Sequence, residues 1–413
     1  LKMELKQCKQ CGMPQRLVQP GRIPLQIEQD GVCVYCHDYN RHKEIYNIDY
    51  EKKRTRFEEM INQRKGKGKY DIAVMFTGGK DSCYSLYLLT KKYNLNVLAI
   101  SWDNGFFGEG HRDNLERVPR QMGVDHKIVS LDKDVLSEFY KNRFHNFGRF
   151  CGCLTPGFLS LSPVLAEAGV SLVASGVSFG QTISKLQNTF LFGDSQGKDE
   201  NVLRKLVDGF GFTSVSGEQF NLSLLIDFVI GNFSDKAIEY FTKCVEALNI
   251  LHSRDAYLVN LPCIFDWDLK NVVEKAKELG WRKPANALDI GHTSCMVEEM
   301  KGYAACSQNI LNNDMNELCA ELRFGCLNRD EFSKKFETLG YADSIPQDIL
   351  DCCLQRSDMT QEEFYSVVKE SPFSKKDLPP INNDIVNRLP IRIPEKATLA
   401  EKMKNYYKTA VLG

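Results

Sequence analysis

Residues 70–89 decide the fold of this chain and read YDIAVMFTGGKDSCYSLYLL. An apolar, β-branched run ends at Gly78 and Gly79, and a helix is predicted to begin directly afterwards, with Asp81 in its first turn. Where a strand passes through a glycine turn into a helix, unpaired backbone N–H groups and the positive end of the helix dipole converge. The stretch therefore predicts an anion-binding site. Its glycines let the backbone approach a phosphate, and Lys80 adds a positive charge.

The spacing of the glycine turn differs from that of a Walker loop, which has four residues between its first glycine and the Gly-Lys-Ser/Thr. It resembles the Ser-Gly-Gly-x-Asp-Ser loop of the PP-loop ATP pyrophosphatases, with Thr77 in place of the first serine. The resemblance implies cleavage of ATP between its α and β phosphates, assisted by Mg²⁺, with adenylation of a substrate oxygen. It implies ATP binding by Thr77, Gly78, Gly79, Lys80, Asp81 and Ser82, with Lys80 and Asp81 also catalytic. A tight turn between a buried strand and a helix is the alternative.

Further strands predict a parallel sheet around this loop. They are expected at residues 96–105, 127–130 and 170–176. The first begins about twenty residues after the loop, the length of one crossover helix in a βαβ unit. Because PP-loop enzymes hold adenosine at the end of their second strand, the resemblance implies that Ser101, Trp102 and Asp103 line the nucleotide pocket. Ligands of parallel sheets lie beyond the carboxyl ends of the strands. We therefore expect the loop, Asp103 and Gly176 to lie at the same edge of the sheet, where Gly176 also binds ATP.

The composition is that of an ordinary globular protein, because 43% of the 413 residues are apolar. A chain of this length is expected to form two or three domains. Its 53 basic and 54 acidic residues give a net charge of −1, whereas RNA-binding proteins usually carry a basic surplus. We therefore expect a small-molecule substrate and no nucleic acid. A polar start and the lack of any apolar run near the ~18–20 residues of a membrane span predict a cytoplasmic protein without membrane contact.

Two Cys-x-x-Cys pairs near the start predict a structural zinc site. The four cysteines are Cys8, Cys11, Cys33 and Cys36. Two such turns can supply the four thiolates of a tetrahedral ion. The segment between them is rich in proline and glycine, which suits a small ribbon that folds only around its metal. Cys33 to His37 also matches a c-type haem attachment pattern, but the other cysteine pair favours zinc.

This ribbon in front of a PP-loop resembles the N-acetyl sugar amidotransferases of surface-polysaccharide pathways. The resemblance rests on residues 8–14, 30–36, 280–282, 322–332 and 359–364, together with the loop. It implies that the chain adenylates the acetamido oxygen of an N-acetyl sugar and replaces it with ammonia. A separate glutaminase is then expected to supply the ammonia as a partner.

Further cysteines point to sulfur chemistry as the alternative. Cys151, Cys153 and Cys263 follow the loop in an order that resembles the PP-loop thiolases of transfer RNA, in which three cysteines hold an iron–sulfur cluster. We expect these three sulfurs to lie within one metal-binding reach at the edge of the ATP cleft, for a [4Fe–4S] cluster or a second metal. The function would then be thiolation of a small molecule or tRNA with a separate sulfur donor.

Cys295 is a candidate catalytic thiol because a nearby histidine, His292, can favour its thiolate. An inert buried thiol is the alternative. Asp266 and Asp268 could hold magnesium or a substrate hydroxyl at the sheet edge, or one of them could cap the helix that follows.

The expected fold class is α/β, with a Rossmann-like (HUP-like) parallel-sheet PP-loop domain, an N-terminal zinc ribbon and a helical C-terminal region. The expected boundaries are 1–45 for the zinc ribbon, 46–69 for a helical linker, 70–200 for the ATP-binding domain, 201–258 for a helical insertion and 259–413 for the end of the catalytic domain and the C-terminal helices. The third functional reading, from another class, is a non-catalytic zinc-ribbon protein that senses a nucleotide.

Overall fold

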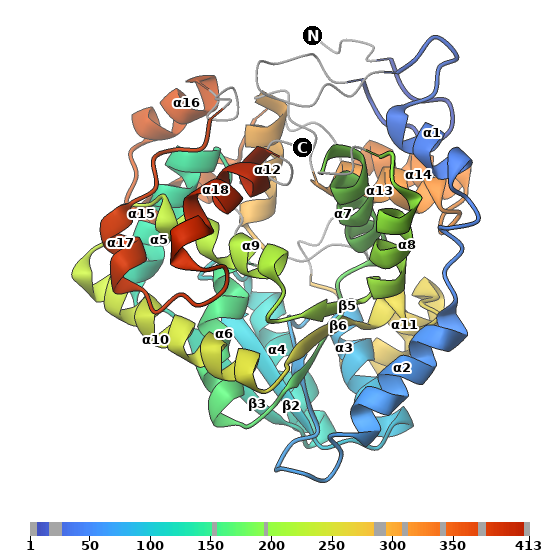
Figure 1. Ribbon diagram of the computed structural model, residues 1–413, viewed down its shortest axis with the longest axis horizontal. Helices are drawn as coiled ribbons and strands as arrows, with labels where there is room; N and C mark the ends of the chain where they lie inside the picture. Colours follow the sequence, from blue (N-terminus) through green and yellow to red (C-terminus); the bar gives the residue numbers. More distant parts are fainter. Residues whose placement is uncertain are drawn as a thin grey trace.

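A six-stranded, mostly parallel sheet forms the centre of the molecule (Figure 1). The computed structural model describes residues 6–15, 27–150, 155–193, 197–284, 295–307, 313–338, 344–370 and 377–408. Within these ranges the strands follow the order β3-β2-β1-β4-β6-β5, and only β5 runs antiparallel to its neighbour. The strands are β1 (Ile72–Met75), β2 (Val97–Asp103), β3 (Asp125–Ser130), β4 (Leu172–Ser175), β5 (Phe212–Ser214) and β6 (Tyr257–Asn260). The predicted α/β fold class is confirmed.

Strand β1 lies in the middle because its residues are apolar on both faces. Ala73 pairs in parallel register with Leu98 of β2 and with Val173 of β4. Alternate residues of β1 enter different cores: Ala73 packs on one side of the sheet, whereas Ile72 and Val74 pack on the other. Helices that cover both faces of a parallel sheet bury the side chains of its strands on both sides.

Helices cover both faces of this sheet. The helices up to residue 192 are α1 (Val34–Arg41), α2 (Tyr50–Asn62), α3 (Lys80–Tyr87), η1 (Leu88–Lys92), α4 (Glu109–Met122), α5 (Lys133–Phe147), α6 (Thr155–Glu167) and α7 (Phe179–Phe192). The helices that follow, up to residue 278, are α8 (Glu200–Gly209), α9 (Glu218–Val229), α10 (Asp235–Ser253), η2 (Leu261–Cys263) and α11 (Leu269–Glu278). Phe57 of α2, Leu86 of α3 and Val272 of α11 share the core of Val74. Phe139 of α5 and Phe241 of α10 share the core of Ala73.

The stretch 201–258 differs from the all-helical insertion that we expected. Residues 212–214 form β5 at the edge of the sheet, and β6 begins at Tyr257. Three residues between two long helices are too short for a strand pattern to be recognised in the sequence. The segment therefore completes the central sheet as well as adding helices.

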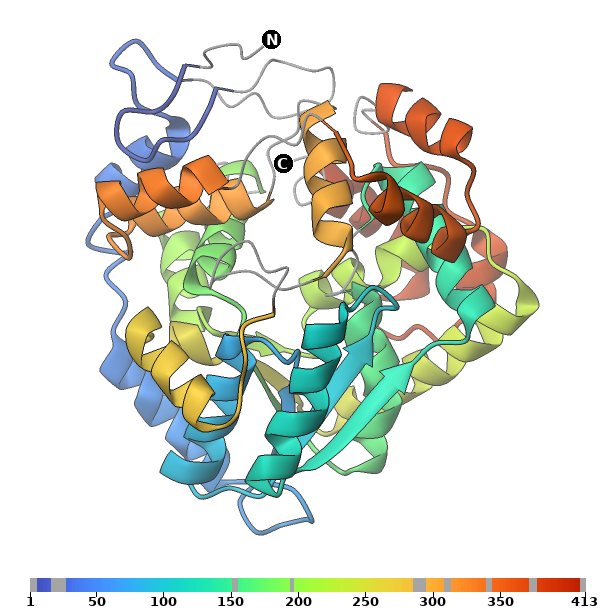
Figure 2. The ribbon, with the colours of Figure 1, turned by 180° about the vertical axis from the view of Figure 1, so that it is seen from behind.

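The C-terminal region is helical, as expected. Its helices are α12 (Val297–Ser307), α13 (Asn313–Arg323), α14 (Arg329–Thr338), α15 (Gln347–Ser357), α16 (Gln361–Glu370), α17 (Asn383–Arg388) and α18 (Lys396–Tyr406). Helices α13 and α14 lie beside α7 and α8 in both views, next to the N-terminal segment (Figures 1 and 2). Within the described ranges, no helix combines the length and the apolar character that crossing a membrane requires.

Candidate nucleotide site and four-cysteine centre

The glycine loop lies at the point of the sheet where strand order favours a ligand. The chain leaves β1 towards β2 on one side, while β4 lies on the other side of β1. Open parallel sheets bind ligands at such a switch point, in the crevice beyond the carboxyl ends of the strands. The loops after β1 and β4 meet here, because a Cβ on Gly176 would lie 3.1 Å from the Cβ of Asp81. Two residues of the predicted site, Gly176 and Asp81, are therefore neighbours.

Two structural features favour glycine over any other residue at Gly78. Its φ is +72°, and a Cβ would lie 3.2 Å from the carbonyl oxygen of His111 and from Cγ of Leu115. The α4 helix is thus pressed against the back of the loop. Burial lowers the pKa of His111 to about 4, with Arg112 adding to the effect, so this histidine is neutral at physiological pH.

Hydroxyl groups fix the shape of the loop. The Ser82 hydroxyl donates to the Gly79 carbonyl at 2.9 Å and accepts from the backbone N–H of Thr77 at 3.2 Å. The Thr77 hydroxyl oxygen lies 3.4 Å from the Gly79 nitrogen, which donates to it. Gly79 precedes α3 in an extended conformation and offers no side-chain cap. The first N–H groups of α3 therefore keep the anion-binding character expected of a helix N-terminus.

Lys80 and Asp81 form a charged pair at the start of α3. Nζ of Lys80 lies 2.5 Å from Oδ2 of Asp81, and the lysine side chain is 8% exposed. The second oxygen of Asp81 accepts a hydrogen bond of 2.8 Å from Nε1 of Trp267. Both oxygens of this carboxylate are thus held. Sequence reasoning missed Trp267, which lies 186 residues further along the chain.

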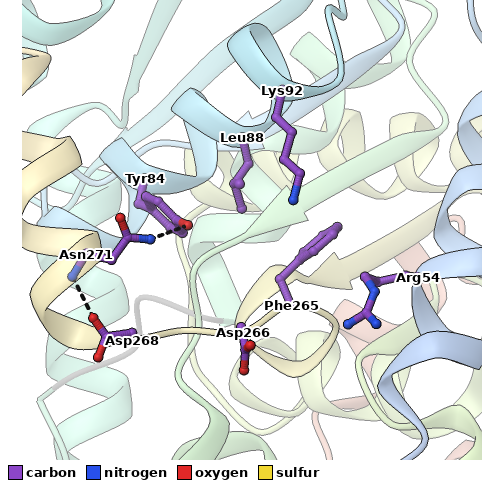
Figure 3. A pocket seen from close by; sticks show the side chains of 8 residues that line it. All are labelled: Arg54, Tyr84, Leu88, Lys92, Phe265, Asp266, Asp268 and Asn271. Atoms are coloured by element: carbon purple, nitrogen blue, oxygen red, sulfur yellow. Dashed lines mark hydrogen bonds between the residues drawn. The ribbon is translucent and has the colours of Figure 1, made fainter.

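Asp268 caps α11, which is one of the two roles predicted for it. Its carboxylate accepts from the backbone N–H of Asn271 at 2.7 Å. Asp266 and Asp268 line a pocket of about 460 Å³, together with Tyr84 and Asn271 (Figure 3). The Asn271 amide donates to the Tyr84 hydroxyl at 3.0 Å, across this pocket wall.

The end of β2 contributes Ser101 and Asp103 at the neighbouring position of the edge. Ser101 is buried and donates to the Phe76 carbonyl while contacting Nε2 of His126 at 2.7 Å, so it supports the end of β1 from within the protein. Asp103 accepts from the Gly105 N–H at 2.9 Å, and its other oxygen lies 3.2 Å from Arg112. Trp102 is buried with its ring against Gly157.

Cys295 lies beside the same strand end. It pairs with Phe107 in an isolated antiparallel bridge, and the Met296 N–H donates to the Phe106 carbonyl at 3.1 Å. The Asn104 side-chain amide lies 3.4 Å from the Cys295 sulfur and donates to it. The structure therefore brings this candidate thiol to the edge that carries Asp103. His292, the expected thiolate partner, lies outside the described residues.

Of the expected cysteine trio, only Cys263 is described. It follows β6 at the same edge of the sheet and is fully buried. Burial raises the pKa of its thiol to about 12, against a smaller opposing effect of a hydrogen bond with Thr182. Cys151 and Cys153 lie outside the described residues, so the shared metal site stays a prediction.

Helix α13 adds an acidic wall that sequence reasoning missed. The Ser178 hydroxyl and the Gln181 side-chain amide, at the start of α7, both donate to the Glu317 carboxylate, the second at 2.8 Å. Glu321 lies one turn further along α13. Burial raises its pKa to about 7, the charge of Glu317 adds to this, and Lys80 is among the cations that oppose it. The wall is therefore within electrostatic range of the nucleotide loop.

The four N-terminal cysteines come together as expected. Their sulfurs all lie within 4.8 Å of one another, and all four side chains are buried. Cys8 and Cys36 are 3.8 Å apart, and Cys11 and Cys33 are 3.7 Å apart. A tetrahedral ion with bonds of about 2.3 Å to sulfur requires sulfurs about 3.8 Å apart. The centre therefore fits a metal ion.

A buried arginine beside the centre supports this assignment. Arg323 is 4% exposed, and its Nη2 lies 3.6 Å from the Cys11 sulfur. It has no carboxylate partner in the part of the chain that the structure describes. The pKa of the Cys11 thiol lies far below its usual range, chiefly because the Cys319 thiol and then the other cluster thiols hydrogen-bond to its sulfur. A buried cation needs a counter-charge, and thiolates at this four-cysteine cluster would supply one.

Fold and site together define an α/β protein with a mostly parallel sheet, a glycine loop at the start of α3 and a four-cysteine cluster that could hold a metal ion. No protein-family model matches the chain. An uncharacterized protein of Methanocaldococcus jannaschii, MJ1599, is 32% identical over 115 residues, which are 28% of this chain and 40% of that protein. The chain thus spans well under half the length of this relative.

Solved structures that resemble the chain include a tRNA thiolase and a tRNA methyltransferase subunit. The U34-tRNA thiolase NcsA from Methanococcus maripaludis, solved with its [4Fe–4S] cluster, is 13% identical with a TM-score of 0.32 over 89% of both chains. A predicted tRNA methyltransferase subunit from M. jannaschii is 20% identical with a TM-score of 0.22, over 35% of this chain and 78% of that one. Both scores are low, so the fold assignment stands on the chain's own strand order and loop.

Proposed function

We propose that the protein is an ATP pyrophosphatase-type enzyme that adenylates a carbonyl oxygen and then replaces that oxygen with another atom. The observation that carries the proposal is the glycine loop at the switch point of the sheet. Gly78 adopts a left-handed conformation with α4 packed close behind it, and on the opposite side a Cβ on Gly176 would lie only 3.1 Å from Asp81. Such a cradle of backbone N–H groups suits the β and γ phosphates of ATP, with Mg²⁺ carrying part of their charge.

The first step uses the charged pair of α3. The carbonyl oxygen of the acceptor attacks the α-phosphorus, a bond from oxygen to phosphorus forms, and the bond to the β-phosphate oxygen breaks with release of pyrophosphate. Lys80 stabilises the charge that develops on the leaving pyrophosphate. Asp81 orients this lysine, since its second oxygen is fixed by Trp267. The resulting O-adenylate makes AMP the leaving group of the next step.

Sulfur transfer is the second half-reaction that we favour. The supporting observation is that Cys295 lies at the end of β2, next to Asn104 and close to Asp103. A thiolate at this position can carry a persulfide whose outer sulfur attacks the adenylated carbon and displaces AMP. A sulfane-sulfur donor must load that persulfide, and an external thiol must then reduce the S–S bond between Cys295 and the product sulfur, which releases the thiocarbonyl product and the free thiol.

Nitrogen transfer is the second candidate. It is favoured by the four-cysteine ribbon directly in front of the nucleotide domain, the feature that carries the resemblance to N-acetyl sugar amidotransferases. In that reaction ammonia attacks the adenylated acetamido carbon, AMP leaves and an amidine forms. A glutaminase partner would supply the ammonia.

The test is pyrophosphate release with ATP and a panel of N-acetyl sugars or unmodified tRNA, with either ammonium or a sulfane-sulfur donor together with a thiol reductant. Product masses distinguish nitrogen from sulfur. Lys80→Ala should abolish release, while Lys91→Ala, at an exposed lysine of η1, serves as the matched control. A protein that binds ATP and releases no pyrophosphate with any combination would instead be the nucleotide sensor of the third reading.

A further inference from the structure

Helix α13 connects the four-cysteine centre to the nucleotide loop. It lies against α7 and next to the N-terminal ribbon in both views (Figures 1 and 2). Leu318 and Cys319 belong to the hydrophobic cluster that surrounds the four cysteines, whereas Glu317 and Glu321 face the start of α7. Residues two apart point to nearly opposite sides of a helix. One short helix thus contacts the four-cysteine centre with one side and the start of α7 with the other.

The ribbon end of this connection is a buried polar network. Nη1 of Arg323 donates to Oε1 of Gln187 on α7 at 2.6 Å, and its Nη2 contacts the Cys11 sulfur. The Gln187 amide donates in turn to Oδ2 of Asp38 at 2.9 Å and to the Tyr35 carbonyl at 3.3 Å. Removing one partner of such a network leaves the others buried and unsatisfied. The network therefore holds α7, α13 and the ribbon in one fixed arrangement.

The nucleotide end is equally tight. A Cβ on Gly180 would lie 2.7 Å from Cγ of Glu317 and 2.8 Å from Cγ of Glu321, so α13 presses directly on the first turn of α7. Glu317 accepts hydrogen bonds from Ser178 and Gln181 in that turn. Two residues before Ser178 lies Gly176, where an added Cβ would lie 3.1 Å from Asp81. A shift of α13 is thus transmitted to the wall of the nucleotide loop.

We propose that the metal centre sets the shape of the nucleotide site through α7 and α13, so that loss of the metal or of Arg323 weakens ATP binding. The inference rests on the proposed nucleotide site at residues 77–82. The two ends are close, because Ser178 and Gln187 are separated by about 14 Å of helix at 1.5 Å per residue. Coupling between two sites is reciprocal. Bound nucleotide must therefore also tighten the hold of the centre on its metal.

The experiment measures binding of a non-hydrolysable ATP analogue and release of zinc to a chelator, with no turnover needed. Arg323→Met and the metal-depleted protein should bind the analogue about tenfold more weakly, within the usual range for coupled sites. Glu317→Gln should weaken analogue binding and retain zinc like the wild type. Arg329→Met is the matched control, since Arg329 bonds the Lys9 and Gln10 carbonyls on the exposed side of the ribbon.

In the wild-type protein, saturating analogue should slow zinc release. The coupling would be overturned if Arg323→Met and wild type bound the analogue with equal affinity, or if the analogue left the rate of zinc release unchanged. Either result would leave the nucleotide site intact. If Arg323→Met does not fold, the wild-type zinc-release measurement decides alone. A wild-type protein that fails to bind the analogue would overturn the nucleotide site and, with it, the coupling.

Discussion

Substituting Gly78 by alanine tests whether the loop is shaped for close contact or is only a turn. The matched control is Gly66→Ala: Gly66 has φ +73°, almost the +72° of Gly78, but a Cβ there would meet nothing within 4 Å. An alanine in this conformation costs about 1–2 kcal/mol, partly offset by about 0.4–1 kcal/mol from a stiffer unfolded chain. Gly66→Ala should therefore lower the free energy of unfolding by about 1 kcal/mol.

At Gly78 the same strain is joined by overpacking, because the new Cβ would lie 3.2 Å from the His111 carbonyl oxygen and from Leu115. Overpacking of a tight site adds about 1–3 kcal/mol. We expect Gly78→Ala to lose about 2–4 kcal/mol in total by urea denaturation and to lose pyrophosphate release as well. Equal losses of stability in the two variants, with activity kept in both, would refute the close packing of α4 against the loop.

Three further outcomes are expected. Lys80→Ala and Asp81→Ala should abolish conversion of ATP to AMP while circular dichroism stays unchanged, and normal turnover in either would remove the proposed role of the α3 pair. Cys33→Ser should lose its zinc and expose the first forty or so residues to protease, because metal binding supplies the folding energy of such ribbons; stoichiometric zinc and an intact N-terminus would mean that the centre is not structural. The raised pKa of Glu321, about 7, means that its protonated form is favoured in the folded state, so its contribution to stability is complete below the unfolded pKa and is lost as pH rises through 7. Glu321→Gln should therefore gain stability relative to wild type between about pH 4.5 and 7, and a constant difference across that range would contradict the assigned burial.

Features carried by contiguous residues could be predicted from the sequence. A few residues of sequence suffice to predict the glycine turn after an apolar run and the clustering of the two Cys-x-x-Cys pairs. The structure places both as expected. The strand β5 was missed because Phe212 to Ser214 is too short to show an alternating pattern.

Contacts made by tertiary packing had no local signal. Glu317 meets Ser178 across 139 residues of sequence, and Trp267 meets Asp81 across 186. In the sequence, each of these side chains looks like an ordinary residue of its own helix or loop. Only the close approach at Gly180, where α13 crosses α7, shows why the acidic wall faces the nucleotide edge.

A crystal structure with an ATP analogue that resists cleavage between its α and β phosphates would show directly whether residues 77–82 bind the nucleotide. We expect the β and γ phosphates on the backbone N–H groups of residues 78–82, with Lys80 beside them. The α-phosphorus should face the edge that carries Asp103 and Cys295. A nucleotide bound elsewhere, or bound with its triphosphate pointing away from this loop, would show that residues 77–82 are not the nucleotide site.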